Sequence, residues 1–171
     1  MAVAATISCT GEEFAGNDPP GYSCEYSPGG ETGRDFLRPT AEQLGKFDAF
    51  VRVRVTGHEE TGPSEAVVNL AEATEVLDGG IAEGADIEVR SNHGVCLETG
   101  EDYYLLLTER AGGDFYEIDG PWSHFPVINN RITLHVEMRL DELIGSFHGL
   151  DPVLFKRRFT EFTGRTDIEV G

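Results

Sequence analysis

Alternating hydrophobic and polar residues mark the centre of the chain. From Phe47 to Val55 every odd position is apolar, and the even positions are charged except for Phe50. A period of two residues over this length is typical of a strand with one buried face, because successive side chains point to opposite sides. We therefore predict that the folded core begins near Phe47 with such a strand.

Four more segments carry strand patterns, and no helical period long enough for a βαβ crossover separates them. The run Tyr103–Leu107 is apolar throughout, which is typical of a strand buried on both faces. The last strand starts from the turn Asn129-Asn130. Five short antiparallel strands predict a mainly β fold, a small barrel or sandwich. The four further strands are expected at residues 66–77, 86–90, 103–107 and 131–137.

The N-terminal residues 1–46 carry turn signals in place of a strand pattern. Two Pro- and Gly-containing stretches, residues 17–21 and 27–30, interrupt them. Residues 40–44 read as one helical turn, with Thr40 as the N-cap and Gln43 as its reciprocal partner. We expect an irregular segment that needs a tether to be ordered, and a disulfide from one of its cysteines would supply one.

The C-terminal residues 138–171 have a helical pattern and are expected to cover the core. Asp151 is a favourable N-cap, Pro152 suits the first helical position, and Gly164 provides a stop. Between Pro152 and Gly164, Phe residues recur at helical spacing. A second apolar stripe at helical spacing comes before Asp151. We predict that these side chains pack onto the barrel; the alternative is a helix that binds a partner. The two stripes are Leu140, Leu143, Ile144 and Phe147, and Phe155, Phe159 and Phe162.

Length and charge limit the classes of protein to which the chain can belong. Its 171 residues suit one domain overall, with residues 47–137 as the core. The formal net charge of −18 argues against nucleic acid and against an anionic membrane surface as partners. No apolar run approaches the length of a membrane span, so we expect no membrane insertion. A solvated acidic surface is the simplest interpretation of the charge.

Three cysteines are present, at Cys9, Cys24 and Cys96. An odd number cannot pair completely within one chain, so one disulfide and one free thiol is the simplest expectation. The first nine residues are too short for a signal peptide and lack a basic region. They fit the residues next to a cleavage point, which is compatible with an extracytoplasmic protein.

The chain shows none of the spacings that usually mark catalysis. The histidines form no HExxH pair, and no nucleophile elbow, phosphate loop or dinucleotide fingerprint is present. His58 lies in an expected loop and could bind a metal together with the glutamates that follow it. A chance cluster of polar residues on the surface is the simpler interpretation. A Cys-His nucleophile from His93 and Cys96 lacks any known signature. We predict no catalytic residue, no metal site, no cofactor and no enzymatic activity.

Aromatic residues gather in the stretch before the last predicted strand. They are Phe115, Tyr116, Trp122, which is the only tryptophan, and Phe125. In a small barrel of the OB type, the loop before the fifth strand flanks the binding face. Exposed aromatics there would suit a protein or a sugar partner. The alternative is that these rings simply cap the barrel.

Three consecutive motifs resemble the netrin-like module, also known as the tissue-inhibitor-of-metalloproteinases-like module. They are residues 75–80, which end in Asp-Gly-Gly, residues 87–91, and residues 96–107, in which a Cys precedes a Gly and a Tyr-Leu strand. The resemblance implies a five-stranded OB-like barrel with flanking helices. It also implies a disulfide between Cys96 and either Cys9 or Cys24. Inhibitory members begin with a zinc-chelating Cys, whereas eight residues precede Cys9 here, so that mechanism requires processing.

Taken together, the sequence predicts a secreted or surface-exposed protein-binding module of the netrin-like class. Protease inhibition is one activity that the resemblance implies for it. The alternative is an acidic β-barrel protein that assembles through its C-terminal helix. A hydrolase built from scattered carboxylates is a third interpretation, which would require two acids that converge in one cleft.

Overall fold

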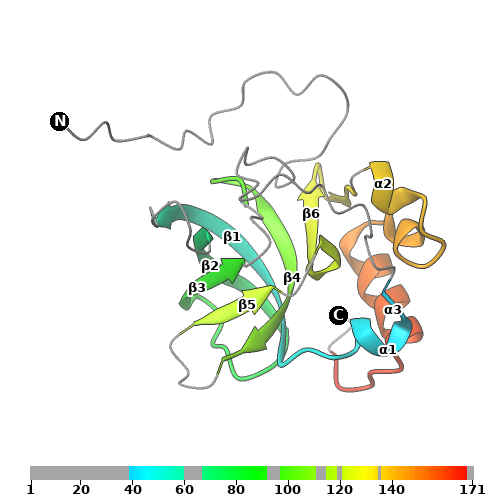
Figure 1. The fold of residues 1–171 in the computed structure, drawn as a ribbon, viewed down its shortest axis with the longest axis horizontal. Coiled ribbons are helices and arrows are strands. Elements are labelled where there is room, and N and C mark those ends of the chain that lie inside the picture. Colours follow the sequence, from blue (N-terminus) through cyan, green and yellow to red (C-terminus); the bar gives the residue numbers. More distant parts are fainter. Residues whose placement is uncertain are drawn as a thin grey trace, which may run out of the picture.

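Five strands form a closed barrel, and helices pack against one side of it (Figure 1). This computed structural model describes residues 39–59, 67–91, 97–110, 115–118, 121–134 and 136–168. The mainly β class and the five-stranded barrel predicted from the sequence are confirmed. The barrel strands are β1 (Ala49–Glu59), β2 (Val67–Asp78), β3 (Asp86–Ser91), β4 (Asp102–Glu109) and β5 (Tyr116–Ile118).

The strand order around the barrel is β1-β2-β3-β5-β4, and β4 pairs with β1 to close the ring. The pair β3–β5 is parallel, and the other pairs are antiparallel. The barrel is therefore mixed, which corrects the expectation of an antiparallel one. The reason is geometric: strand directions alternate around a ring only when the number of strands is even. A closed ring of five must contain at least one parallel pair.

The fifth barrel strand was predicted at residues 131–137, and this position was wrong. The barrel uses β5, whose three residues are too few to show alternation in the sequence. Outside the ring, β6 (His124–Ile128) and β7 (Arg131–Ile132) form a hairpin in which β6 pairs with the first half of β4. The predicted turn at Asn129 and Asn130 is confirmed, because both residues have positive φ, at 51° and 58°.

Strand β4 is buried on both faces, as its apolar run predicted. Tyr103, Leu105 and Leu107 point into the barrel, whereas Tyr104 and Leu106 point outward beneath the helices. The molecule therefore has an inner core inside the barrel and an outer core between the barrel and its helical cover. The outer core accounts for Phe50, the exception in the alternating pattern of β1. Its members include Leu44, Phe47, Phe50, Leu77, Tyr104, Leu106, Phe125, Val127, Phe147, Phe155 and Phe159.

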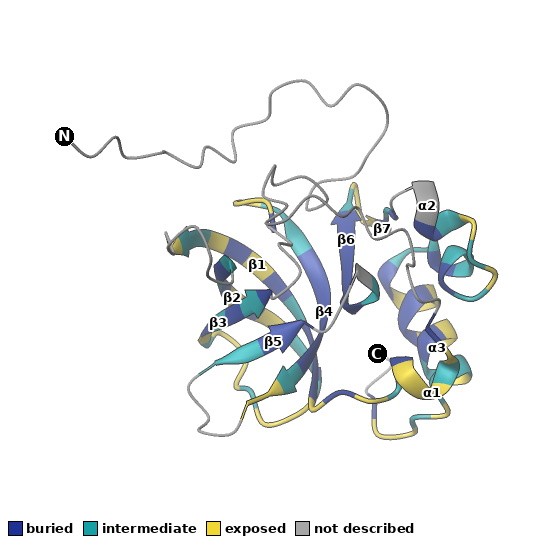
Figure 2. Ribbon diagram, in the orientation of Figure 1, coloured by how far each residue is buried: buried dark blue, intermediate teal, exposed yellow. Residues whose placement is uncertain are grey.

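The helical cover consists of short elements and one longer helix (Figure 2). The longer helix is α3 (Pro152–Thr163). Its N-cap is Asp151, whose carboxylate accepts the backbone N–H of Leu154 at 2.9 Å, and its C-cap is Gly164, with φ 67°. A capping box of Thr40 and Gln43 begins α1, as predicted. The short elements are α1 (Ala41–Leu44), α2 (Val136–Arg139) and the 3₁₀ helices η1 (Pro121–Ser123) and η2 (Ile144–Phe147).

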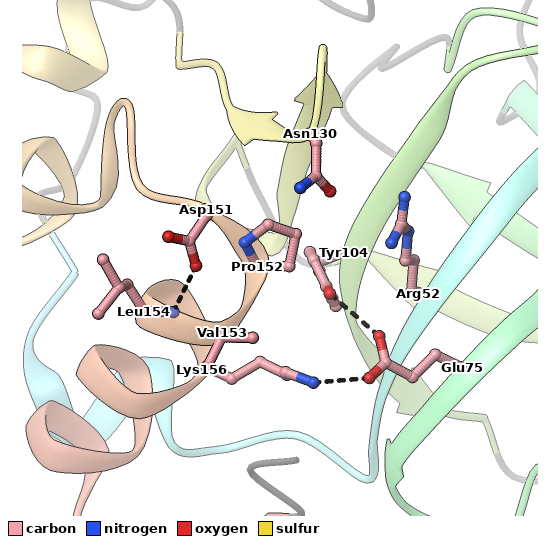
Figure 3. A pocket seen from close by; sticks show the side chains of 9 residues that line it. All are labelled: Arg52, Glu75, Tyr104, Asn130, Asp151, Pro152, Val153, Leu154 and Lys156. Carbon is pink, nitrogen blue, oxygen red and sulfur yellow. Dashed lines mark hydrogen bonds and ion pairs between the residues drawn. The ribbon is translucent and has the colours of Figure 1, made fainter.

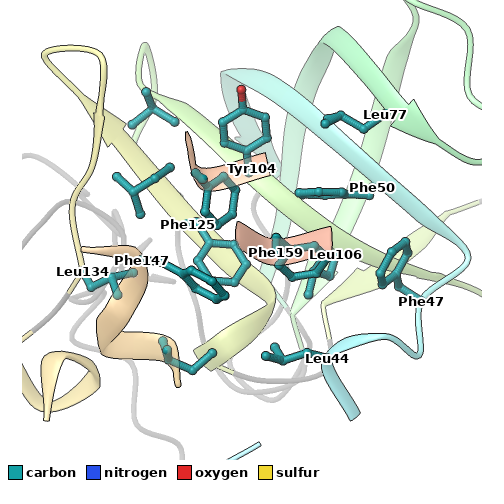
Figure 4. Close-up of a cluster of buried hydrophobic side chains, with 14 of the residues drawn as sticks. Leu44, Phe47, Phe50, Leu77, Tyr104, Leu106, Phe125, Leu134, Phe147 and Phe159 are labelled. Carbon is teal, nitrogen blue, oxygen red and sulfur yellow. The ribbon is translucent and has the colours of Figure 1, made fainter. Parts of the chain in front are cut away.

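Aromatic rings hold α3 against the outer wall of the barrel (Figure 4). The Phe155 ring lies with its centroid 5.2 Å from that of Tyr104 and 5.1 Å from that of Phe125. The Phe159 ring lies 4.7 Å from that of Phe50. Tilted pairs at these distances stabilise a core beyond the area that they bury. The predicted packing of the C-terminal stripe is therefore confirmed for Phe155 and Phe159, which are fully buried.

Replacing Phe155 by Ala should destabilise the protein by about 3–5 kcal/mol, because the substitution leaves a cavity among five neighbouring rings. Phe162→Ala is the matched control, since Phe162 is only partly buried at the edge of the same cluster. It should cost about 1 kcal/mol. Urea unfolding measures both values. Equal losses for the two variants would contradict a central role for Phe155.

Candidate functional site

An open groove runs between the outer wall of the barrel, the β6–β7 turn and the start of α3 (Figure 3). We call it the α3 groove. Its volume is about 750 Å³, which is within the range of ligand pockets. The groove forms where α3 crosses the outer wall of the barrel, at the boundary between the apolar outer core and the charged residues Arg52 and Glu75. The lining residues are Arg52, Glu75, Tyr104, Asn130, Asp151, Pro152, Val153, Leu154 and Lys156.

The floor of the groove is a chain of three polar side chains from three elements. Lys156 on α3 donates to Glu75 Oε1 on β2 at 2.7 Å, and the Tyr104 hydroxyl on β4 donates to Glu75 Oε2 at 3.0 Å (Figure 3). Burial, and after it the charge of Glu75, raises the pKa of Tyr104, so its phenol stays neutral and keeps donating. The chain therefore links the helix to two barrel strands.

Arg52 forms the side of the groove next to this chain. Its Nη2 lies 2.7 Å from Asp102 Oδ2, its guanidinium lies 5.8 Å from the Tyr104 ring centroid, and Arg54 bonds the other oxygen of Asp102. Burial acts to raise the pKa of Asp102, but the hydrogen bonds from Arg54 and Arg52 outweigh it and hold that pKa below its usual range. Asp102 is thus a charged anchor that fixes Arg52 in place.

The rim of the groove is aliphatic. Val153 and Leu154, in the first turn of α3, are 44% and 45% exposed. The acid, phenol and ammonium groups of the floor bond to one another, and Tyr104 holds its proton tightly. The groove therefore combines two exposed aliphatic side chains with a polar floor whose groups are hydrogen-bonded to one another.

A second, smaller pocket lies at the β2–β3 turn beside the start of β5. We call it the aromatic pocket, and its volume is about 370 Å³. Phe115 and Tyr116 are both half-buried there. The guanidinium of Arg90 lies 3.9 Å from the centroid of the Phe115 ring. The lining residues are Gly80, Ile81, Ala82, Ala85, Asp86, Ile87, Glu88, Phe115 and Tyr116.

The structure does not bring the four aromatic candidates together. Phe115 and Tyr116 line the aromatic pocket, whereas Trp122 is half-buried against the outer core. Phe125 is fully buried between β4 and α3, so its assignment as a partner-binding residue was wrong. Phe125 and Trp122 instead fit the alternative that these rings pack against the barrel. The sequence placed all four in one loop because it did not reveal β5 between them.

The cysteines Cys9, Cys24 and Cys96 lie outside the described residues, and so does His93, so the disulfide stays a prediction. His58 belongs to β1 and not to a loop; its Nε2 lies 2.6 Å from the carbonyl oxygen of Leu97. Within the described part of the chain, no group of three His, Cys, Asp or Glu side chains is placed to hold a metal ion.

Sequence reasoning missed the polar floor of the α3 groove. Lys156 lies between the phenylalanines of the C-terminal stripe and is buried, with 8% of its side chain exposed. One signal was available: Lys156 follows Pro152 by four residues and precedes Phe159 by three, which places it on the inward face of the helix. Its partner Glu75 lies 81 residues away and has no such signal.

No family model matches the chain, and no curated protein matches it either. Across the residues that the structure describes, every helix is too short or too polar to cross a bilayer. Inference about function therefore starts from the fold and the geometry of the two pockets.

The Lys156–Glu75 pair should respond unequally to loss of its two members. Glu75→Leu leaves a buried ammonium without its carboxylate and should cost about 2–3 kcal/mol. Lys156→Met leaves Glu75, which is 36% exposed and can be hydrated, so the cost should stay below about 1 kcal/mol. Urea unfolding of both variants measures the asymmetry. A larger loss for Lys156→Met would contradict it.

Proposed function

We propose that the protein is a non-catalytic, secreted or surface-exposed module that binds another protein through the α3 groove. One observation carries the proposal: exposed Val153 and Leu154 stand beside a polar floor whose own groups are already paired. A partner could place an aliphatic side chain and its backbone against this surface without leaving a charged group of the floor buried and unpaired. The barrel and α3 hold both parts of the groove in place before binding, which limits the entropic cost.

Charge defines the kind of partner that the groove would meet. With a net charge of −18, the protein attracts basic surfaces and repels acidic ones over long range. The occupant that we propose is an extended segment of a basic protein that places an aliphatic side chain against Val153 and Leu154. Its association rate should therefore fall as salt is added.

The resemblance of residues 47–107 to the netrin-like module supports an extracytoplasmic location. On this proposal Cys96 forms a disulfide with Cys9 or Cys24 and ties residues 1–46 to the barrel. Closing so long a loop contributes about 4 kcal/mol in the chain-entropy model. Protease inhibition through a terminal cysteine would follow only if processing exposes Cys9.

The disulfide can be tested by mass. We expect protein secreted from cells to be lighter by two hydrogens without reductant than after reduction, and Cys96→Ser to abolish the difference. Peptide mapping of the non-reduced protein then identifies the N-terminal partner. Three free thiols in the secreted protein would contradict both the disulfide and its tethering role.

Binding through the groove can be tested with a displayed library of random peptides. We expect the library to yield a basic sequence family that binds the wild-type protein, and Val153→Asp to weaken that binding at least about tenfold. An acidic residue in the first turn of α3 is favourable for the helix, so this variant should stay folded. Affinity is measured by titration calorimetry with the selected peptide.

Leu140→Asp is the matched control, since Leu140 is 76% exposed and lies outside the groove lining. It should change the peptide affinity less than about twofold. Equal binding by the Val153→Asp variant would contradict the proposal. The exposure of Val153 and Leu154 also favours the second candidate, self-assembly through α3. Light scattering decides that alternative, because a wild-type oligomer that dissociates in Val153→Asp would identify a second copy as the occupant.

A further inference from the structure

The aromatic pocket combines rings with acidic groups. Asp86 and Glu88 line it beside Phe115 and Tyr116. Burial, and after it the charges of Glu109 and Asp48, raises the pKa of Tyr116, so two further acids act on this ring. These residues lie on β3, β4 and β5 or directly before β1 and β5, and the barrel brings them to one end. The pocket is therefore a place where negative charge surrounds an aromatic wall.

One ring of the pocket already binds a cation of the same chain. The Arg90 guanidinium lies 3.9 Å from the Phe115 ring centroid, within the range in which a cation is attracted to an aromatic face. The nearby arginines are engaged by acids, Arg90 with Glu88 at 4.0 Å and Arg110 with Glu117. These two ion pairs therefore do not neutralise the negative charge of Asp86, Glu109 and Asp48.

We propose that the aromatic pocket is a separate binding site for a basic side chain of a protein partner, an arginine in the first instance. Its guanidinium would lie against Tyr116 and pair with Asp86, whereas Phe115 and Glu88, which Arg90 already contacts, would form the adjoining wall of the pocket. The volume of about 370 Å³ is at the small end of ligand pockets, which suits one side chain and not a whole helix. A planar guanidinium favours arginine, because it stacks on rings and pairs with a carboxylate through two hydrogens.

This site goes beyond the proposed function, since it does not involve the α3 groove and can be tested alone. The probe is N-acetyl-arginine amide, titrated into the full-length protein at low salt and followed by the amide signals in NMR spectra. We expect saturable shifts confined to Gly80–Glu88 and Phe115–Ile118. The neutral isostere N-acetyl-citrulline amide should bind roughly fivefold more weakly or not at all.

Paired charge variants locate the site. Asp86→Asn with Glu88→Gln should weaken arginine binding roughly fivefold. Glu142→Gln with Glu161→Gln removes the same charge from exposed positions of the helical cover and should change it less than about twofold. Equal losses for the two pairs, equal binding of citrulline, or shifts outside the pocket would overturn the proposal. Val153→Asp should leave arginine binding unchanged, so failure of the groove proposal is distinguishable from failure of this one.

Discussion

The contact between α3 and the outer wall of the barrel determines how the rest of the molecule is arranged. A barrel of this size fills its own interior, and its outer surface would normally be polar. Here Phe50 and Tyr104 face outward from the barrel and meet Phe125 of the neighbouring strand β6, and two rings of α3 cover all three. Because this wall must be covered, the chain after β5 returns along the barrel as a hairpin and then as helices.

The same contact creates the α3 groove at its edge. Along β1 the outer face changes from Phe50 to Arg52 within one repeat of the strand, so α3 passes from an apolar to a charged wall. Lys156 lies at that change and meets Glu75 there. The aromatic pocket, by contrast, lies at an end of the barrel and depends on β5. The α3 groove thus depends on how α3 packs on the barrel wall, whereas the aromatic pocket depends on β5, and the two sites share no lining residue.

Alternating patterns and continuous apolar runs were sufficient to predict four of the five barrel strands, and capping signals predicted the bounds of α3. What they missed follows from length and distance. The three residues of β5 carry no period, so Phe115 and Phe125 seemed to share one loop. Glu75 and Lys156 meet only after the barrel has closed, because their spacing along the chain is set by topology and not by local pattern.

The ring of five strands has a further consequence for how the chain folds. Its closing pair joins Ala49 to Leu107, and its parallel pair joins Val89 to Tyr116, so neither can form from neighbouring residues. Contacts of such high sequence separation slow the search for the native state, typically to milliseconds or seconds. Until both pairs form, β1 and β3 expose unpaired edges, which is when association between chains is easiest. Closure of the ring therefore limits the speed of folding and ends the period of greatest risk of aggregation.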